Sequence, residues 1–330
     1  MGASMTSEAA WTAASAVVED LWLVGGSVRD ELMGRSCEDF DFVTPLSADE
    51  IETAIRAAGR KPYTLGKRFG TVGMMAEGRK LEITTLRGAT LDDDLRHRDF
   101  TINAMAWQPG LLEDPYGGRA DLEAGVLRAP GPARESIRDD ALRILRAARF
   151  ESELGFSADE ELKEAMARYA HKLSGVAKER CALELDRTLS GPHAAKGLRL
   201  LAETGALVWV LPELALQESY EQNSPYHDRD LLEHTLAVVE AVDAADLDMR
   251  WAALLHDAGK PYVRAEKPGR STYVHHELLS AEIVDRVAVS LRWSNARHAR
   301  VRELVAGHMA PSSPLRAADD SGKPADRPRG

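Results

Sequence analysis

The sequence predicts an α+β protein, in which an N-terminal mixed sheet with helices is followed by a long all-α region. In residues 1–110, short apolar runs are separated by glycines, as is typical of strands and turns. From Ile137 onward, apolar residues instead recur every three or four positions, which indicates helices. With 330 residues, 44% of them hydrophobic, the chain can bury a sizeable core.

The expected elements follow the chain in order. An Ala-rich helix is expected within residues 1–20, and strands at "LWLVGG" (21–26) and "DFDFVT" (39–44). After a helix near 49–58, "GTVGMMAEGRKLEITTLR" (70–87) alternates apolar and polar residues around Glu77–Gly78, which predicts a β-hairpin. Beyond Ile137, the breaks between helices are expected at "SGPH", "VLPEL" and "NSPY".

Composition narrows the class of protein. The net charge is −11, from 42 basic and 53 acidic residues, so the whole chain lacks the basic field of a general nucleic-acid binder. Its two cysteines match no metal spacing and cannot form a disulfide framework. No apolar run is long enough for a membrane span, and no signal peptide is recognisable, so a cytoplasmic location is predicted. The polar, Pro-rich residues 311–330 are predicted to be a disordered tail.

Two carboxylates in the second expected strand suggest phosphoryl chemistry. Asp39 and Asp41 would project from one face, about 6–7 Å apart, because alternate strand residues point the same way. Such a pair can hold magnesium ions, and Glu82 on the hairpin could complete the metal face or be an ordinary surface carboxylate. Gly25 and Gly26, ahead of a helix, would let backbone N–H groups approach a phosphate. Together these features predict a site for a nucleoside triphosphate.

The same residues lie in "LVGGSVRDELMG" and "EDFDFVT", which resemble the head-domain signature of the class II tRNA nucleotidyltransferase and poly(A) polymerase family. Further motifs of that family are resembled, in the family's order, by "DLRHRDFTINAMAW" (94–107), "EDPYGGRADLEAGVLRA" (113–129), "RDDALRILRAARF" (138–150) and "KERCALELDRTL" (178–189). The resemblance implies a nucleotidyltransferase head over 1–128, a helical neck over 129–200 and an HD-type helical body over 201–310.

The resemblance also implies roles for individual residues. Asp39 and Asp41 would be catalytic and hold two Mg²⁺ ions. Nucleotide binding is implied for Gly25, Gly26, Arg29, Arg98, Asp99, Asn103, Asp140, Arg143, Arg146 and Arg149. Asp140 and Arg143, three residues apart on one helix face, could select cytosine and adenine, because a carboxylate accepts from an amino group and repels the carbonyl of uracil or guanine. For Arg146 and Arg149, structural ion pairs with Glu151 or Glu153 remain an alternative.

The segment "GATLDD" (88–93) is shorter than its counterpart in family members that add the full CCA triplet. In those members this loop is thought to help switch the pocket from CTP to ATP. We therefore predict addition of two cytidines to the 3′ end of tRNA, with a separate enzyme supplying the terminal adenosine. Full CCA addition from CTP and ATP, and poly(A) polymerisation, are the alternatives within the family.

Most of the ten histidines lie after Tyr226. "DLLEHTL" and "WAALLHDAGKP" resemble the HD phosphohydrolase superfamily, which implies a divalent transition metal held by His234, His256 and Asp257. The superfamily's last aspartate should follow His308 on a further helix, where this chain becomes polar. Asp319 and Asp320 are poor candidates in that context, so the ligand set is expected to be incomplete or completed from elsewhere. A metal-dependent phosphohydrolase is the alternative from a different class.

Overall fold

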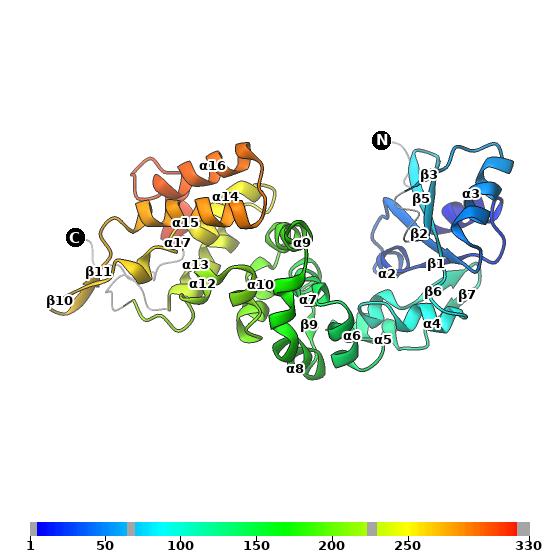
Figure 1. The fold of residues 1–330 in the computed structure, drawn as a ribbon, viewed down its shortest axis with the longest axis horizontal. Helices are drawn as coiled ribbons and strands as arrows, with labels where there is room; N and C mark the ends of the chain where they lie inside the picture. The colour runs from blue at the N-terminus through cyan, green and yellow to red at the C-terminus, as the bar shows by residue number, and fades with distance from the viewer. Residues whose placement is uncertain (1–4, 65–69, 223–229, 322–330) are drawn as a thin grey trace. The chain divides into compact units, whose positions relative to one another are not determined.

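The computed structural model describes residues 5–64, 70–222 and 230–321 (Figure 1). The chain divides into two compact units, residues 1–136 and 137–330. The first unit therefore extends beyond the head boundary predicted at residue 128. The second unit contains the predicted HD body together with most of the predicted neck.

A seven-stranded mixed sheet forms the centre of the first unit, in the order β3-β4-β5-β2-β1-β6-β7. Only the pairing of β2 with β5 is parallel within this sheet. The strands are β1 (Trp22–Val24), β2 (Asp39–Thr44), β3 (Tyr63–Thr64), β4 (Thr71–Ala76), β5 (Arg79–Thr85), β6 (Ala106–Gln108) and β7 (Leu111–Glu113). The mixed sheet predicted from the sequence is thus confirmed.

The helices that accompany this sheet are short. They are α1 (Ser7–Ser15), α2 (Gly26–Leu32), α3 (Ala48–Ala57), α4 (Leu91–Arg96), the 3₁₀ helix η2 (Thr101–Asn103), α5 (Gly118–Ala124) and α6 (Ala133–Asp139), which crosses the boundary at Ser136. The two-residue strand β8 (Val126–Leu127) precedes α6.

The two faces of the sheet differ at β2. One face is covered by the main core, whereas the other buries Val43 in a smaller core with Leu95 of α4 and leaves the β2 carboxylates exposed, and we call it the open face. Phe40 and Phe42 of β2 are fully buried in a core that includes Ile51 and Ile55 of α3. Because strand residues alternate, Asp39 and Asp41 lie on the opposite face, and both are exposed. The alternation of β2 therefore fixes where the two carboxylates can act.

The predicted hairpin is present. β4 and β5 pair antiparallel from Thr71↔Thr84 to Ala76↔Arg79, and Glu77 and Gly78 form the turn between them with φ of 49° and 78°. Positive φ at both turn residues gives the twist that a two-residue hairpin needs. The hairpin places Glu82 beside Asp41, its register partner on β2.

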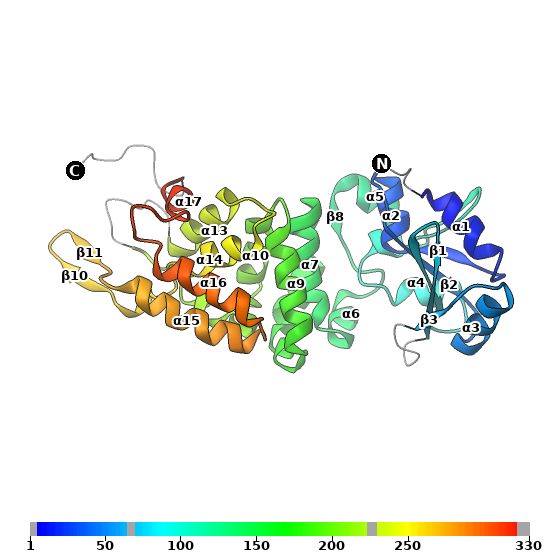
Figure 2. The ribbon, with the colours of Figure 1, turned by 90° about the horizontal axis from the view of Figure 1, so that it is seen from above.

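The second unit is almost entirely helical, and Figure 2 shows α7 beside α9 and α15 beside α16. Its helices are α7 (Leu142–Leu154), α8 (Glu160–Tyr169), η3 (Ala170–Gly175), α9 (Lys178–Ser190), α10 (Ala194–Glu203), α11 (Leu207–Val210), α12 (Pro212–Ala215), α13 (Leu231–Ala241), α14 (Leu247–Leu255), η4 (Lys260–Tyr262), α15 (His276–Ser290), α16 (Asn295–Ala306) and α17 (Arg316–Ser321). Short strands are β9 (Ser157–Ala158), β10 (Ala265–Lys267) and β11 (Arg270–Thr272).

The last helix corrects one prediction. Residues 311–330 were expected to be disordered, yet α17 forms at Arg316–Ser321. Leu315 is fully buried, and Ala318 and Asp319 are also buried, so one face of this polar segment packs against the unit. The rest of the predicted tail, 322–330, lies outside the described residues.

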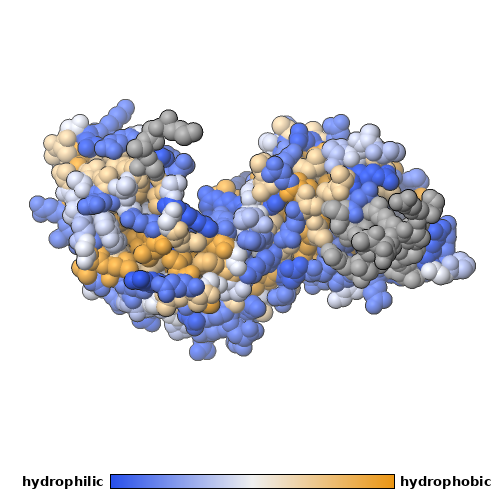
Figure 3. Space-filling model, turned by 180° about the vertical axis from the view of Figure 1, so that it is seen from behind, coloured by the Kyte–Doolittle hydropathy of each residue, from blue (hydrophilic) through white to orange (hydrophobic). Residues whose placement is uncertain are grey.

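Most of the surface seen in Figure 3 is hydrophilic, with apolar residues gathered in patches on both units. Among the described helices, none has the length and apolar character needed to cross a membrane.

A buried arginine stabilises the second unit. Arg250 of α14 is 3% exposed, and its guanidinium donates to the backbone carbonyls of Val242 (3.0 Å), Gly191 (2.7 Å) and Leu189. We expect Arg250→Leu to lower the free energy of unfolding by about 2–4 kcal/mol, because buried carbonyls lose their donors. The matched change Arg302→Leu, which removes a partly exposed pair with Asp285, should cost about 1 kcal/mol or less. Urea denaturation measures both, and equal losses would contradict this role.

Candidate active site and metal centre

Three carboxylates share the open face of the sheet. Asp39 and Asp41 alternate along β2, and the parallel register sets Glu82 of β5 directly opposite Asp41. Loss of hydration and the charge of Asp39 raise the pKa of Asp41, although its side chain stays accessible and Arg98 opposes the shift. Burial and the charges of Asp41 and Asp39 likewise raise the pKa of Glu82. A bound cation would relieve this repulsion, so the oxygen ligands fit magnesium.

The glycine turn before α2 lies against an arginine. Gly25, the N-cap of α2, has φ of 73°, and a β-carbon there would lie 2.8 Å from Nη1 of Arg98. Only glycine suits both the backbone and this close approach. Arg98 is held by Asp94, whose Oδ2 accepts from Nη2 at 2.9 Å and from Nε at 3.2 Å. Asp94 was not identified from the sequence as a functional residue, although its i, i+4 spacing to Arg98 is a recognisable signal.

A second hydrogen-bonded chain joins other predicted nucleotide-binding residues. Arg29 of α2 donates through Nη1 to Oδ1 of Asn103 at 2.8 Å, and Nδ2 of Asn103 donates to Oδ1 of Asp99 at 3.0 Å. Ser27, which sequence reasoning missed, fixes α2 on β2. Its hydroxyl donates to the carbonyl of Asp39 (3.2 Å) and accepts from the N–H of Asp41 (3.3 Å). The structure therefore joins Arg29, Asn103 and Asp99, three of the predicted nucleotide-binding residues, in one hydrogen-bonded chain.

In the second unit, Asp140 differs in position from the prediction. It lies between α6 and α7 and not within a helix, and its Oδ1 accepts from the N–H of Leu142 at 3.0 Å. Arg143 lies inside α7, so the two residues do not share a helix face as expected. Oδ2 of Asp140 instead pairs with Nη2 of Arg180 on α9, at 3.2 Å. Asp140 and Arg180 line an open cavity of about 550 Å³ together with Lys172.

The two following arginines of α7 contact Glu184 of α9. Arg149 is 7% exposed, and its Nε lies 3.0 Å from Oε2 of Glu184. Arg146 is more open and lies 3.8 Å from Oε1 of the same carboxylate. Arg149 therefore forms an ion pair between α7 and α9, as in the structural alternative, and its contact with a nucleotide stays a prediction. Its main partner is Glu184, whereas the anticipated Glu153 lies farther away, at 3.9 Å.

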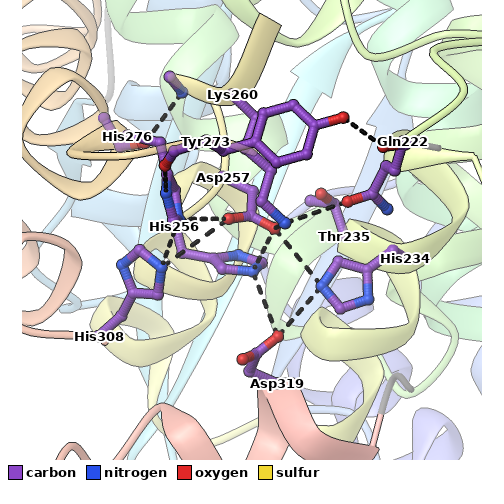
Figure 4. Close-up of polar contacts among 12 residues, drawn as sticks. Gln222, His234, Thr235, His256, Asp257, Lys260, Tyr273, His276, His308 and Asp319 are labelled. Atoms are coloured by element: carbon purple, nitrogen blue, oxygen red, sulfur yellow. Dashed lines mark hydrogen bonds and ion pairs between the residues drawn. The ribbon is translucent and has the colours of Figure 1, made fainter. Parts of the chain in front are cut away.

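The predicted HD residues converge in the interior of the second unit (Figure 4). Nε2 of His256 lies 3.1 Å from Oδ2 of Asp257, and Nε2 of His234 lies 3.5 Å from the same oxygen. Asp319 of α17 completes the group, since its Oδ1 lies 3.1 Å from Nε2 of His234 and 3.8 Å from that of His256. The prediction that Asp319 is a poor candidate was wrong, because burial of Leu315 and Ala318 turns its carboxylate inward.

A second group of ligands adjoins the first. Nε2 of His276 and of His308 lie 3.1 and 3.8 Å from Oδ1 of Asp257. Nδ1 of each histidine lies within hydrogen-bond distance of a backbone carbonyl, at 2.7 Å for His276 and 2.8 Å for His308. A carbonyl can only accept, so each Nδ1 carries a proton. Nε2 of His276 and Nε2 of His308 lie 3.1 Å apart, a contact that is satisfied either by a proton on one of them or by a shared metal ion.

Burial would lower the pKa of His256, but the charges and hydrogen bonds of Asp257 and Asp319 outweigh it and raise this pKa to about 9, so a metal would have to displace a proton from His256. Burial and the charge of His256 lower the pKa of His308 to about 4, so its imidazole is neutral at pH 7. Asp257 has a pKa well below its usual range, because the charges of His256 and Lys260 outweigh the effect of burial. Lys260 was not predicted, and its Nζ lies 2.6 Å from Oδ2 of Asp257. Buried imidazoles and carboxylates of this kind are ligands for a divalent transition metal.

The fold and these sites define a nucleotidyl-transfer head joined to a helical unit with an HD cluster. Three family profiles match in chain order: "Poly A polymerase head domain" at residues 21–128, "Probable RNA and SrmB-binding site of polymerase A" at 155–217, and "HD domain" at 231–326. The HD match includes Asp319, in agreement with its position in the cluster.

Individual relatives specify the family further. The A-adding tRNA nucleotidyltransferase of Deinococcus radiodurans is 35% identical, over 87% of this chain and 68% of the relative. The CC-adding tRNA nucleotidyltransferase of Thermus thermophilus is 36% identical, over 88% and 69%. The crystal structure of the Bacillus stearothermophilus CCA-adding enzyme in complex with CTP is 29% identical, with a TM-score of 0.66, over 94% of this chain and 78% of that one. The chain belongs to the tRNA nucleotidyltransferase family and is an enzyme.

Proposed function

We propose that this enzyme adds two cytidines from CTP to the 3′ end of tRNA, without a template, and that a separate enzyme adds the terminal adenosine. The relatives include A-, CC- and CCA-adding enzymes of similar identity, so identity does not decide among these activities. The observation that carries the proposal is the structure of residues 88–93. The two free, buried cysteines fit action in the cytoplasm, where tRNA is processed.

Residues 88–93 form a short turn that continues directly into α4, without a flexible loop between them. Thr90 caps α4 in a capping box with Asp93, whose Oδ2 accepts from the N–H groups of Ala89 and Thr90, both at 3.1 Å. Gly88 has φ of 98°, and a β-carbon there would lie 2.6 Å from Cβ of Asp93. A segment fixed in this way lacks the reach to reshape a nucleotide pocket between CTP and ATP.

The head residues account for transfer. The 3′ hydroxyl of the acceptor forms a bond to the α-phosphorus of CTP while the bond to pyrophosphate breaks, so positioning and charge stabilisation dominate catalysis. Asp39 and Asp41 would hold two Mg²⁺ ions, which supply charge neutralisation when bound. Arg98 lies at the glycine turn, where it can neutralise phosphate charge. In the second unit, the carboxylate of Asp140 can accept from the amino group of cytosine.

We expect a tRNA transcript without its CCA end to be extended by two nucleotides with CTP alone, and by no more when ATP is added. Single-nucleotide gel resolution measures the product lengths, and a transcript that already ends in CC is the control. Extension by three would support full CCA addition and refute the argument from residues 88–93. One adenosine added only to the CC-ending transcript would indicate A addition, and a long adenosine ladder would indicate a poly(A) polymerase.

A second candidate function is metal-dependent phosphohydrolysis by the HD cluster. The specific observation in its favour is the convergence of His276 and His308 on Asp257, beside the group that His234 and His256 form with the same carboxylate. The cluster fits two divalent transition metal ions that share Asp257. Hydrolysis of a chromogenic phosphodiester with added Mn²⁺ or Ni²⁺ tests this function.

A further inference from the structure

One polar group on the open face of the head sheet has no role so far. Tyr63 of β3 pairs with Gly73 of β4, Gly73 pairs with Glu82 of β5, and Glu82 pairs with Asp41 of β2. Directly opposite residues on neighbouring strands point to the same face. Tyr63 therefore belongs to the row that ends at the catalytic carboxylates.

Gly73 makes room for the tyrosine ring. A β-carbon at Gly73 would overlap the tip of the ring and would lie 2.6 Å from the Tyr63 hydroxyl oxygen. The ring tip thus lies above β4, one strand away from Glu82. The φ of Gly73 lies outside the left-handed region, so the backbone conformation does not require glycine. Glycine is required because any β-carbon would overlap the Tyr63 ring.

The hydroxyl is available as a donor. Its oxygen is buried, and among the described residues it has no hydrogen-bond partner. A buried hydroxyl without a partner is unfavourable, which points to a ligand group that completes it. Burial, followed by the charges of Glu82, Asp39 and Asp41, raises the pKa of Tyr63 to about 12, so the hydroxyl keeps its proton at neutral pH.

The sheet order indicates which substrate would meet this donor. The glycine turn for the triphosphate follows β1, on one side of β2, whereas β5, β4 and β3 extend on the other side. In phosphoryl transfer the attacking and leaving oxygens are roughly in line on opposite sides of the phosphorus. With the pyrophosphate at the glycine turn and the attacking oxygen on the far side of the phosphorus, the 3′ end would approach over β5 and β4.

We infer that the Tyr63 hydroxyl donates a hydrogen bond to the terminal nucleotide of the acceptor RNA and so positions its 3′ hydroxyl for attack. This inference rests on the proposed transfer to an RNA 3′ end, whichever nucleotide is added. It assigns Tyr63 to the acceptor side of the site, opposite the triphosphate turn.

The test is Tyr63→Phe, which removes the hydroxyl and keeps the ring. Initial rates are measured first with the concentration of CCA-less tRNA varied and then with the concentration of CTP varied. We expect kcat/KM for tRNA to fall about 5–10-fold, which corresponds to the free energy of one hydrogen bond. The KM for CTP should stay within about twofold, because the triphosphate contacts are untouched. Tyr262→Phe makes the same change at a side chain that is 51% exposed in the other unit, and it should alter neither value.

A second variant tests the geometry. Gly73→Ala should displace the ring and lower kcat/KM for tRNA, and Gly73→Ala with Tyr63→Phe should lose less than the two single losses combined. Thermal denaturation of each variant separates these effects from unfolding. Unchanged tRNA kinetics in Tyr63→Phe, or a change confined to CTP, would overturn the inference while the wild type still extends tRNA. A wild type that extends no RNA would refute the proposed function, and this inference with it.

Discussion

Asp41→Ala is expected to reduce nucleotide addition by about 10³-fold or more, because loss of a metal-ligating carboxylate removes several kcal/mol of transition-state stabilisation. Asp41 lies at the centre of the open face, opposite Glu82 and within the field of Arg98. Asp39→Ala should behave similarly. The measurement is the single-turnover rate of extension of a CCA-less tRNA with saturating CTP and Mg²⁺.

The control distinguishes loss of chemistry from loss of structure. Glu38→Ala removes a neighbouring carboxylate that is 83% exposed and lies 3.5 Å from Arg79, and it should retain activity. Because loss of hydration, and then the charge of Asp39, raise the pKa of Asp41, its carboxylate is unfavourable in the folded protein, and Asp41→Ala should unfold at a temperature no lower than the wild type. Retention of more than about a tenth of the wild-type rate in Asp41→Ala would contradict the role of this carboxylate as an essential ligand.

The positions of the head residues could be predicted because their signals are local. Alternation along β2 places Asp39 and Asp41 on one face, and a positive-φ glycine begins α2. The same motifs contain Arg29, Asp99 and Asn103, which the structure joins into one network. The side chains that orient these groups were harder to predict from the sequence. The role of Asp94, for example, depends on its contact with Arg98 in the folded protein.

Sequence reasoning failed where tertiary packing overrides composition. The segment around Asp319 is polar enough to predict disorder, but the burial of Leu315 and Ala318 decides its structure. Asp140 fits a helical spacing, yet it precedes α7, accepts from the N–H of Leu142 and pairs with Arg180, a residue distant in sequence. A spacing rule cannot anticipate a partner that only the fold brings close.

The same limit applies to the HD cluster. His276 and His308 were recognised as histidines in the helical region, but their convergence on Asp257 depends on how α15 and α16 lie against α14. Asp257 is the one residue common to both groups of candidate metal ligands among the described residues. It presents Oδ2 to His234 and His256, and Oδ1 to the other two histidines.

Asp257→Asn should therefore abolish binding at both positions, whereas loss of one histidine should weaken only one. An amide is a weaker ligand than a carboxylate, and its nitrogen cannot ligate, so we expect an affinity loss of about 100-fold or more for Mn²⁺. Equilibrium dialysis with metal analysis counts the bound ions. The rate of tRNA extension should be unchanged, because the head carboxylates are intact.

Asp285→Asn is the matched control. Asp285 also accepts hydrogen bonds from two basic side chains, His298 at 2.6 Å and Arg302 at 3.1 Å, but on a partly exposed surface.

The number of bound ions decides whether metal ions or the protein's own charges neutralise the cluster. The ammonium of Lys260 already supplies one positive charge to Oδ2 of Asp257. Two ions in the wild type and none in Asp257→Asn would establish the shared carboxylate. A wild type that binds no ion would mean that Lys260 and a proton between the two histidines neutralise the cluster instead.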